Sequence, residues 1–430
     1  MLESLAQAFR IPELKRRIYF DMIMFAIFVL GAHIPVPGIN HEKLEALFGS
    51  GGFLGLVDVF SGGALRKMTI FAMGITPYIN ASIIMQMLTL AIPSLEAMSK
   101  EGEAGRKQIA KITRWLTIVL AFLQAMGFSF SFRAATTGLF GVLQMCLIMT
   151  AGTAFLLWLG EQVTEKGIGN GVSLVIFAGI MTSLPYQTSL IVKSVEGGLV
   201  SPLQVITLIL LFVGTIYGIV LITQGTRRIP IQHVKRVVGM RVTPANSSFL
   251  PIKVNTAGVI PIIFAISILL FPVQIFSSIP SKAEWFLRLK QIAQYFSPGA
   301  SWWAMALYVL LIIVFTYFYT AVVMNVQDMA DNLKKYGNYI PGIRPGKPTF
   351  DYLDRVVSRI TLAGAVFLAI VAVIQYIAPA LTGVSSFTLI GGTSLLIVVG
   401  VAIETMQAIE AQLLMRNYEG FIKQSSVSVS

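Results

Sequence analysis

Long apolar windows with almost no charged residue constrain the fold of this chain more than any other feature. A charge at the centre of a bilayer costs at least about 2.5 kcal/mol, so such windows mark transmembrane helices. They lie at 18–38, 68–95, 115–132, 134–160, 167–192, 197–226, 254–281, 291–327 and 360–403. Only 12% of the 430 residues are charged, about half the share of a soluble protein. The chain is therefore an integral membrane protein with little material for a separate soluble domain.

The last window is twice as long as one crossing needs. It contains Pro379 and a polar stretch at 382–386, so we expect it to fold back once and to supply two spans. The first window follows Lys15, Arg16 and Arg17 as in a secretory signal, but it is too long for a signal core and no small-residue cleavage site closes it. We therefore expect an all-α membrane protein with ten transmembrane helices, the first one retained.

The basic residues predict the orientation. With ten spans, both termini lie on one side of the membrane, and 24 of the 32 lysines and arginines fall on that side. Basic loops favour the cytoplasmic face, so we expect both termini in the cytoplasm. The single cysteine, Cys146, lies inside an apolar window, which excludes an intramolecular disulfide and a cysteine-based metal cluster.

Two of the windows match each other at an offset of 184 residues. Gly74 and Pro77 of the second window align with Gly258 and Pro261 of the seventh, and an aliphatic run follows both. Each site alone is compatible with an ordinary proline kink. Together, holding the same rank among spans one to five and six to ten, they predict two inverted five-helix repeats, residues 1–192 and 193–430. Broken backbone at membrane depth then indicates a pathway between the halves.

Isoleucines recur at helical spacing in two windows, and these spans carry almost no midplane ionisable residue. Ile75, Ile79 and Ile83 share one helix face, and Ile176 and Ile180 share another. Isoleucines that face lipid or only pack are the alternative; converging faces would form an apolar constriction that blocks ions. The segment 52–71 is half apolar and too charged to cross, so it is either a surface amphipathic helix or a re-entrant element that occludes a pore.

Two long loops on the terminus side are basic. Residues 225–254 have six lysines and arginines and no acidic residue, and their alternating pattern predicts a projecting hairpin. The loop 325–358 presents Arg344 and Lys347 on a Pro/Gly turn. Such patches suit an acidic protein surface or the phosphates of RNA, with anionic lipid head groups as the competing partner. The sequence has no nucleotide-binding loop and no histidine cluster, so we expect no cofactor and no metal, and any work must be powered by another molecule.

Seven segments together resemble the SecY/Sec61 alpha family, the channel subunits of the Sec protein translocase. They are HIPVPGI from His33, FAMGITPYINASIIMQML from Phe71, EGEAGRKQIAKITRW from Glu101, LWLGEQVTEKGIGNGVSLVIFAGI from Leu157, NTAGVIPIIFAISILLFP from Asn255, IPGIRPGKPT from Ile340 and GGTSLLIVVGVAIET from Gly391. The resemblance covers nearly the whole chain and is closest to the bacterial SecY proteins. It implies an hourglass channel with a ring of aliphatic side chains at its waist.

The resemblance also implies roles for individual residues. The pore ring would be Ile75, Ile79, Ile176, Ile180, Ile263 and Ile397. A re-entrant plug helix at about 54–67 would include Leu54, Asp58, Phe60, Arg66 and Lys67. A lateral gate, through which transmembrane segments leave for the lipid, would include Asn80, Gln86 and Phe271. The surface for a motor or ribosome would include Arg227, Arg228, Lys235, Arg236, Arg241, Arg344 and Lys347.

The implied function is a passive, gated conduit for unfolded polypeptides in the bacterial cytoplasmic membrane, not an enzyme. The implied partners are SecE and SecG in a heterotrimer, the SecA ATPase, signal peptides, and the ribosome with its nascent chain, whose RNA would contact the basic loops. A secondary transporter with inverted repeats is the main rival, but it would need a compact polar site and midplane ionisable residues. A membrane-protein insertase or scaffold without a continuous pore is the second rival.

Overall fold

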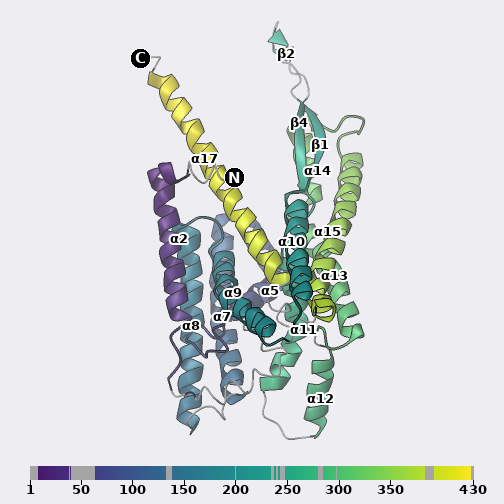
Figure 1. Cartoon of the computed structure of the whole chain (residues 1–430). Coiled ribbons are helices and arrows are strands. Elements are labelled where there is room, and N and C mark those ends of the chain that lie inside the picture. Colours follow the sequence, from purple (N-terminus) through teal and green to yellow (C-terminus); the bar gives the residue numbers. More distant parts are fainter. Residues whose placement is uncertain are drawn as a thin grey trace. The chain divides into compact units, whose positions relative to one another are not determined.

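A computed structural model describes residues 8–37, 39, 63–131, 138–198, 200–233, 237–238, 241–242, 247–278, 284–296, 298–382 and 392–427, and these are largely helical (Figure 1). The helices are α2 (Pro12–Gly31), α5 (Thr76–Ala91), α6 (Pro93–Lys100), α7 (Glu103–Ser131), α8 (Gly138–Lys166), α9 (Gly171–Glu196), α10 (Pro202–Gln224), α11 (Ile260–Ser278), α12 (Glu284–Tyr295), α13 (Trp302–Val323), α14 (Val326–Lys335), α15 (Lys347–Thr382) and α17 (Thr393–Val427). The strands are β1 (Thr226–His233), β2 (Val237–Val238), β3 (Arg241–Val242), β4 (Ser247–Lys253) and β5 (Asn338–Tyr339).

The apolar helices follow the windows expected from the sequence. Among the described residues, seven helices are long and apolar enough to cross a membrane, and the pair α5 and α6, bent by 100°, would make an eighth. A shorter apolar helix covers Ile260–Leu270, and α2 covers residues 18–31 of the first window. The fold is thus a membrane-spanning helical bundle. The last window does form two helices, α15 and α17, as expected.

Two windows were wrong in their detail. The window 291–327 is not one helix, because it starts inside α12 and breaks at Pro298 and Gly299, whose φ is 86°. A new helix, α13, begins after Ser301, whose hydroxyl accepts a hydrogen bond from the backbone N–H of Ala304 at 3.1 Å. The second window begins at residue 68, but its first eight residues form turns and helix α5 starts only at Thr76.

The chain divides into two compact units. The first comprises Met1–Ser201, Leu270–Ser297 and Ile397–Ser430, and the second comprises Pro202–Leu269 and Pro298–Leu396. The helices α11 and α17 contribute to both units. The division into repeats 1–192 and 193–430 stays a prediction.

In the first unit, α8 lies against α7, α9 and α2, and α5 packs on α7. The segment between Gly63 and Ile75 is held on this bundle by aromatic stacking. The ring of Phe71 stacks between Phe28 of α2 and Phe155 of α8, with centroid separations of 6.0 and 5.9 Å. A Cβ on Gly152 of α8 would overlap the backbone carbonyl of Ile70. Helix α8 therefore approaches this segment as closely as backbone atoms allow.

In the second unit, α15 contacts α13, α10 and α14. Helix α10 leads into β1, which pairs antiparallel with β4 from Thr226↔Lys253 to Gln232↔Ser247, while β2 and β3 pair at the tip (Figure 1). The hairpin expected from the alternating pattern is confirmed. Strand β5 joins its other edge, so the sheet order is β4-β1-β5. An apolar core under the hairpin base holds it on α14 and α15: Ile229, Ile231, Ile252, Ala330, Leu333, Ile340, Leu353 and Val357.

Candidate functional site

Helix α5 starts two residues after a left-handed glycine, at the place where the sequence predicts broken backbone. Gly74 has φ 56°, a conformation that other residues adopt only with strain, and Pro77 occupies the first turn of the helix. The carbonyl of Gly74 accepts a hydrogen bond from the Thr153 hydroxyl of α8 at 3.5 Å. The N–H of Ile79 donates to the carbonyl of Ile75 at 3.1 Å. The interruption is thus a defined helix start held by a neighbouring helix.

Helix α11 starts in the same way. Gly258 has φ 63°, the helix begins at Ile260, and Pro261 lies in its first turn, each at the offset of 184 from the first site. The N–H of Ile263 donates to the carbonyl of Val259 at 3.4 Å. The carbonyl of Gly258 accepts a hydrogen bond from the side-chain amide of Asn255 at 3.1 Å. The match between the two windows is therefore one of backbone conformation as well as of residue type.

A third helix start of this kind was missed from the sequence. Gly392 has φ 59°, and α17 begins at Thr393. The carbonyl oxygen of the Gln375 side chain, which is buried in α15, accepts hydrogen bonds from the N–H and the hydroxyl of Thr393 at 3.3 and 3.2 Å. A Cβ on Gly392 would lie only 2.7 Å from Gln375. In the sequence, the pair Gly391 and Gly392 followed by an apolar run could have indicated this helix start.

Three predicted ring residues occupy the same place relative to these glycines. Ile79, Ile263 and Ile397 each lie five residues after the left-handed glycine of their helix. Ile79 and Ile263 are half-buried and Ile397 is buried. Each of the three helices therefore presents a β-branched aliphatic side chain at about its second turn. The ring that these side chains would form together stays a prediction.

The remaining ring residues are buried in the first unit. Ile75 precedes the first turn of α5, and Ile176 and Ile180 lie on α9. Helix α9 also follows a left-handed glycine, Gly169, and is capped by Asn170, whose side-chain oxygen accepts from the N–H groups of residues 172 and 173.

The gate and plug residues are described in part. Asn80 is buried on α5, and the side-chain amide of Gln86 donates to the Ser82 hydroxyl at 3.4 Å. The side chain of Phe271 lies outside the described residues, as do Leu54, Asp58 and Phe60. The guanidinium of Arg66 lies 4.7 Å from the ring centroid of Tyr186 on α9, and Lys67 is exposed. The end of the predicted plug segment is thus fixed to α9 by a cation–π contact.

The basic residues of the loops are exposed where they are described. Arg227 and Arg228 lie on β1. Arg344 lies in the turn before α15, where Gly342 and Gly346 are left-handed, and Lys347 is the first residue of α15. The carbonyl of Arg344 accepts from the Thr349 hydroxyl at 2.9 Å. Lys235, Arg236 and the side chain of Arg241 lie outside the described residues. The structure therefore presents Arg344 on a turn stabilised from within the loop.

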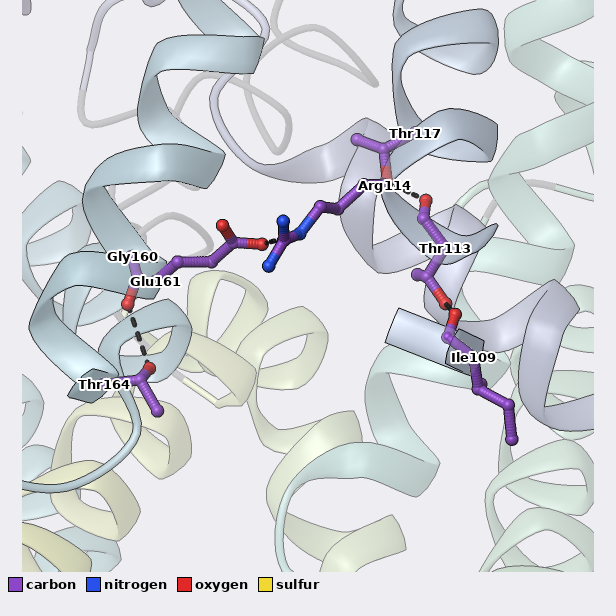
Figure 2. Close-up of polar contacts among 7 residues, drawn as sticks. All are labelled: Ile109, Thr113, Arg114, Thr117, Gly160, Glu161 and Thr164. Atoms are coloured by element: carbon purple, nitrogen blue, oxygen red, sulfur yellow. Dashed lines mark hydrogen bonds and ion pairs between the residues drawn. The ribbon is translucent and has the colours of Figure 1, made fainter. Parts of the chain in front are cut away.

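An ion pair that sequence reasoning missed joins α7 to α8. Figure 2 shows the side chain of Arg114 reaching across to Glu161, while neighbouring threonines bond to carbonyls of their own helices. Tyr78 of α5 lies within electrostatic reach of both charges. The pair links the two helices. Neither residue stood out in the sequence, because each lies at the charged end of a window.

A second polar contact shapes the turn between α8 and α9. The buried carboxylate of Asp21 on α2 accepts from the N–H of Ile168 at 3.0 Å, and Arg17 donates to the carbonyl of Gly167 at 3.3 Å. Asp21 therefore positions the backbone of this turn. Within the described ranges, no group of three His, Cys, Asp or Glu side chains lies close enough together to hold a metal ion.

Comparison with known proteins gives one consistent answer. The sequence model of the SecY family matches residues 69–406. The protein translocase subunit SecY of Halalkalibacterium halodurans is 44% identical over 438 residues, covering 98% of this chain and all of the relative. The subunit of the same name from Staphylococcus aureus is 43% identical, covering 98% of this chain and 99% of the relative.

Solved structures of low sequence identity share the fold. A structure described as a protein-conducting channel superposes with a TM-score of 0.66 at 19% identity, covering 95% of this chain and 96% of that one. A SecY structure described by the role of its plug domain in the closed state has a TM-score of 0.65 at 20% identity with the same coverage. Sec61 from a canine ribosome–channel complex has a TM-score of 0.63 at 18% identity, again covering 95% and 96%.

Proposed function

The chain belongs to the SecY family, and on this premise we propose how its own residues conduct unfolded polypeptide through the membrane. The conduit has a waist closed by branched aliphatic side chains. These are Ile75, Ile79, Ile176, Ile180, Ile263 and Ile397. Transmembrane segments leave sideways, through a seam that includes Asn80, Gln86 and Phe271.

The placement of Ile79, Ile263 and Ile397, each five residues after a left-handed glycine, carries this proposal. A helix that starts within the apolar window leaves its first N–H groups without intrahelical partners, and lipid cannot satisfy them. Such starts are tolerated where they meet protein or a water-filled cavity. Three helix starts with the same left-handed glycine, each followed by an isoleucine, therefore support a constriction in an aqueous path.

A ring of isoleucines suits the transport of polypeptides of any sequence. Apolar side chains make no hydrogen bond that would hold a passing chain, and a closed apolar constriction excludes ions by dewetting. The ring supplies no energy. We infer that the chain is not an enzyme and that a partner drives transport.

The plug and the partners complete the proposal. The segment 54–67 closes the waist from outside. The cation–π contact between Arg66 and Tyr186 fixes the end of this segment. SecE and SecG assemble with the chain, while SecA or the ribosome binds the basic loops through residues that include Arg227, Arg228 and Arg344. Signal peptides bind at the seam, and anionic lipid surrounds the loops. The location is the bacterial cytoplasmic membrane, with both termini in the cytoplasm.

The waist is tested by the ion leak of the resting channel. Ile79→Ser and Ile263→Ser, alone and together, should raise the conductance of the reconstituted complex in planar bilayers, because a polar ring lets water and ions enter. Leu88→Ser on α5 and Ile268→Ser on α11, two exposed positions on the same helices, are matched controls that should leave the leak unchanged. A double variant that leaks no more than the controls would exclude these residues from the waist and favour the solute-transporter alternative.

The motor surface is tested by charge reversal on the cytoplasmic loop. Arg344→Glu should reduce SecA-driven transport of a preprotein into vesicles about tenfold or more, with the complex still assembled. Lys335→Glu on α14 makes the same charge change at another exposed position and should have little effect. Equal losses in the two variants would show that net charge, and not this turn, binds the motor.

A further inference from the structure

Helix α12 lies between two apolar helices but cannot cross the membrane itself. Its 12 residues span about 18 Å, well short of the roughly 30 Å hydrocarbon core. It follows α11 as a separate helix, and six residues separate its end from α13 (Figure 1). The connection between α11 and α13 therefore contains a short helix, although a loop alone could join them.

One face of α12 packs on the protein. Phe286 and Ala293, seven residues apart, are both buried. The ring of Phe286 meets Phe276 of α11 edge to face, with 5.8 Å between the centroids. Because Phe276 lies in the last turn of α11, this contact places α12 at the end of an apolar helix.

A second apolar face is exposed. Trp285, Leu289, Ile292 and Phe296 follow each other at spacings of four, three and four residues, which puts them in one stripe along the helix. Their exposed fractions are 66%, 37%, 55% and 45%. Phe296 continues the helical turn, since its N–H donates to the carbonyls of Ile292 and Ala293 at 3.3 and 3.2 Å. Exposing these large apolar side chains to water costs free energy, so we expect lipid or another protein to cover the stripe.

The rest of the helix is polar and carries a net positive charge. Exposed Gln291 and Gln294 lie on the side away from the stripe, and Arg288 borders it. Lys290 is half-buried on the same polar side, and Glu284 is the one acidic residue of the helix. An arginine beside an apolar stripe can keep its stem in an apolar layer and its guanidinium in a polar one.

We infer that α12 lies flat in the bilayer interface, with Trp285, Leu289, Ile292 and Phe296 among the upper acyl segments and Arg288 and Lys290 at the lipid phosphates. This is the arrangement of an interfacial helix, whose apolar face sinks a few ångströms below the head groups. Lipid is the favoured occupant because the stripe lies on a helix that packs against the last turn of an apolar helix through Phe286 and Phe276, and because the basic side chain of Arg288 borders it. By the expected topology, the leaflet is the one facing away from the termini, so this surface is separate from the cytoplasmic basic loops.

Depth-dependent quenching tests this arrangement on the complete channel complex. In a Cys146→Ser background, single cysteines replace Leu289, Ile292, Gln291 and Gln294 and carry the fluorophore NBD in proteoliposomes. Lipids with a nitroxide at acyl carbon 5 should quench the label at 289 and 292 at least threefold more than at 291 and 294. Aqueous iodide should give the reverse order.

The outcomes separate lipid from other surroundings. Equal quenching at all four positions by either quencher would overturn the proposal, because it would mean that α12 stands free in water or has no fixed face. Labels at 289 and 292 shielded from both quenchers would also overturn it and would point to a protein partner on the stripe. A further variant, Arg288→Glu, should reduce nitroxide quenching at 292 in vesicles that contain phosphatidylglycerol, whereas Gln294→Glu should not; equal effects would remove the basic residues from the lipid contact.

Discussion

The helix starts of α5 and α11 have the same backbone conformation but are stabilised by different side chains. Ile70 and Val254 correspond at the offset of 184, and each carbonyl lies against a glycine of a later helix, Gly152 of α8 and Gly364 of α15. After Gly152 comes Thr153, whose hydroxyl bonds the Gly74 carbonyl from a distance of 79 residues in sequence. After Gly364 comes Ala365, which has no hydroxyl.

At the second site, the hydrogen bond to the glycine carbonyl comes instead from a residue of the same turn. Asn255 corresponds to Phe71, and its amide bonds the Gly258 carbonyl three residues later. In the first site, Phe71 instead stacks between Phe28 and Phe155. One backbone conformation is thus stabilised by long-range contacts in the first unit and by a local hydrogen bond in the second. The backbone geometry, and not a particular partner, is what the two sites have in common.

The largest expected loss of stability comes from adding a methyl group at Gly152 or at Gly364, and the loss should differ between these two glycines. Gly152→Ala should destabilise the protein by about 3 kcal/mol, because its Cβ would overlap the Ile70 carbonyl and the backbone must move. Gly364→Ala should cost less, about 2 kcal/mol, because its Cβ would lie 2.8 Å from the Val254 carbonyl. Thermal unfolding of the detergent-solubilised complex measures both. Gly214→Ala on α10, where nothing lies within 4 Å, is the control, and a larger loss at 364 than at 152 would contradict this ranking.

Substitution of the left-handed glycines should affect the two sites equally. Gly74→Ala and Gly258→Ala should each cost about 1–2 kcal/mol, because a Cβ is disfavoured at φ 56° and 63°. Asparagine tolerates this conformation better, so Gly74→Asn and Gly258→Asn should lose less than the alanine variants. The same unfolding measurement applies. An unchanged melting temperature at either alanine variant would mean that its turn does not require the left-handed conformation.

The smallest effect concerns the hydrogen bonds to the two carbonyls. Thr153→Val and Asn255→Ala should each cost about 1 kcal/mol, the usual net value of one hydrogen bond. Ala365→Ser offers the missing hydroxyl and should recover part of the loss in the Asn255→Ala background but nothing in the wild-type background. Absence of recovery would show that α15 does not approach Gly258 as α8 approaches Gly74.

The sequence predicted features that local chemistry determines. The two glycine–proline starts, the hairpin at 225–254 and the turn carrying Arg344 each depend on residues close together in the chain, and the structure has all three. The start of α17 was missed because Gln375, which holds Thr393, lies 18 residues away on another helix. The pair of Arg114 and Glu161 was missed for the same reason, since nothing in either segment indicates that α7 and α8 bring their ends together.

The break between α12 and α13 has a different origin. Hydropathy alone joined them, because Ile292, Tyr295 and Phe296 are as apolar as a transmembrane helix requires. Pro298, Gly299 and Ser301 were the local indication of a new helix start. The pore ring is the least predictable part, since burial in one bundle and exposure to a pore both select isoleucine.

The base of the hairpin joins the basic loop mechanically to the helix start at Gly258. Strand β1 leaves α10 after a single residue, and the N–H of Val254 donates to the carbonyl of Gly225 at 2.9 Å, which ties both ends of the hairpin together. Eight residues of β1 form an arm of about 26 Å. A protein that pushes on the outer end of this arm exerts a torque at its base, nine residues before Ile263 and four before the left-handed glycine.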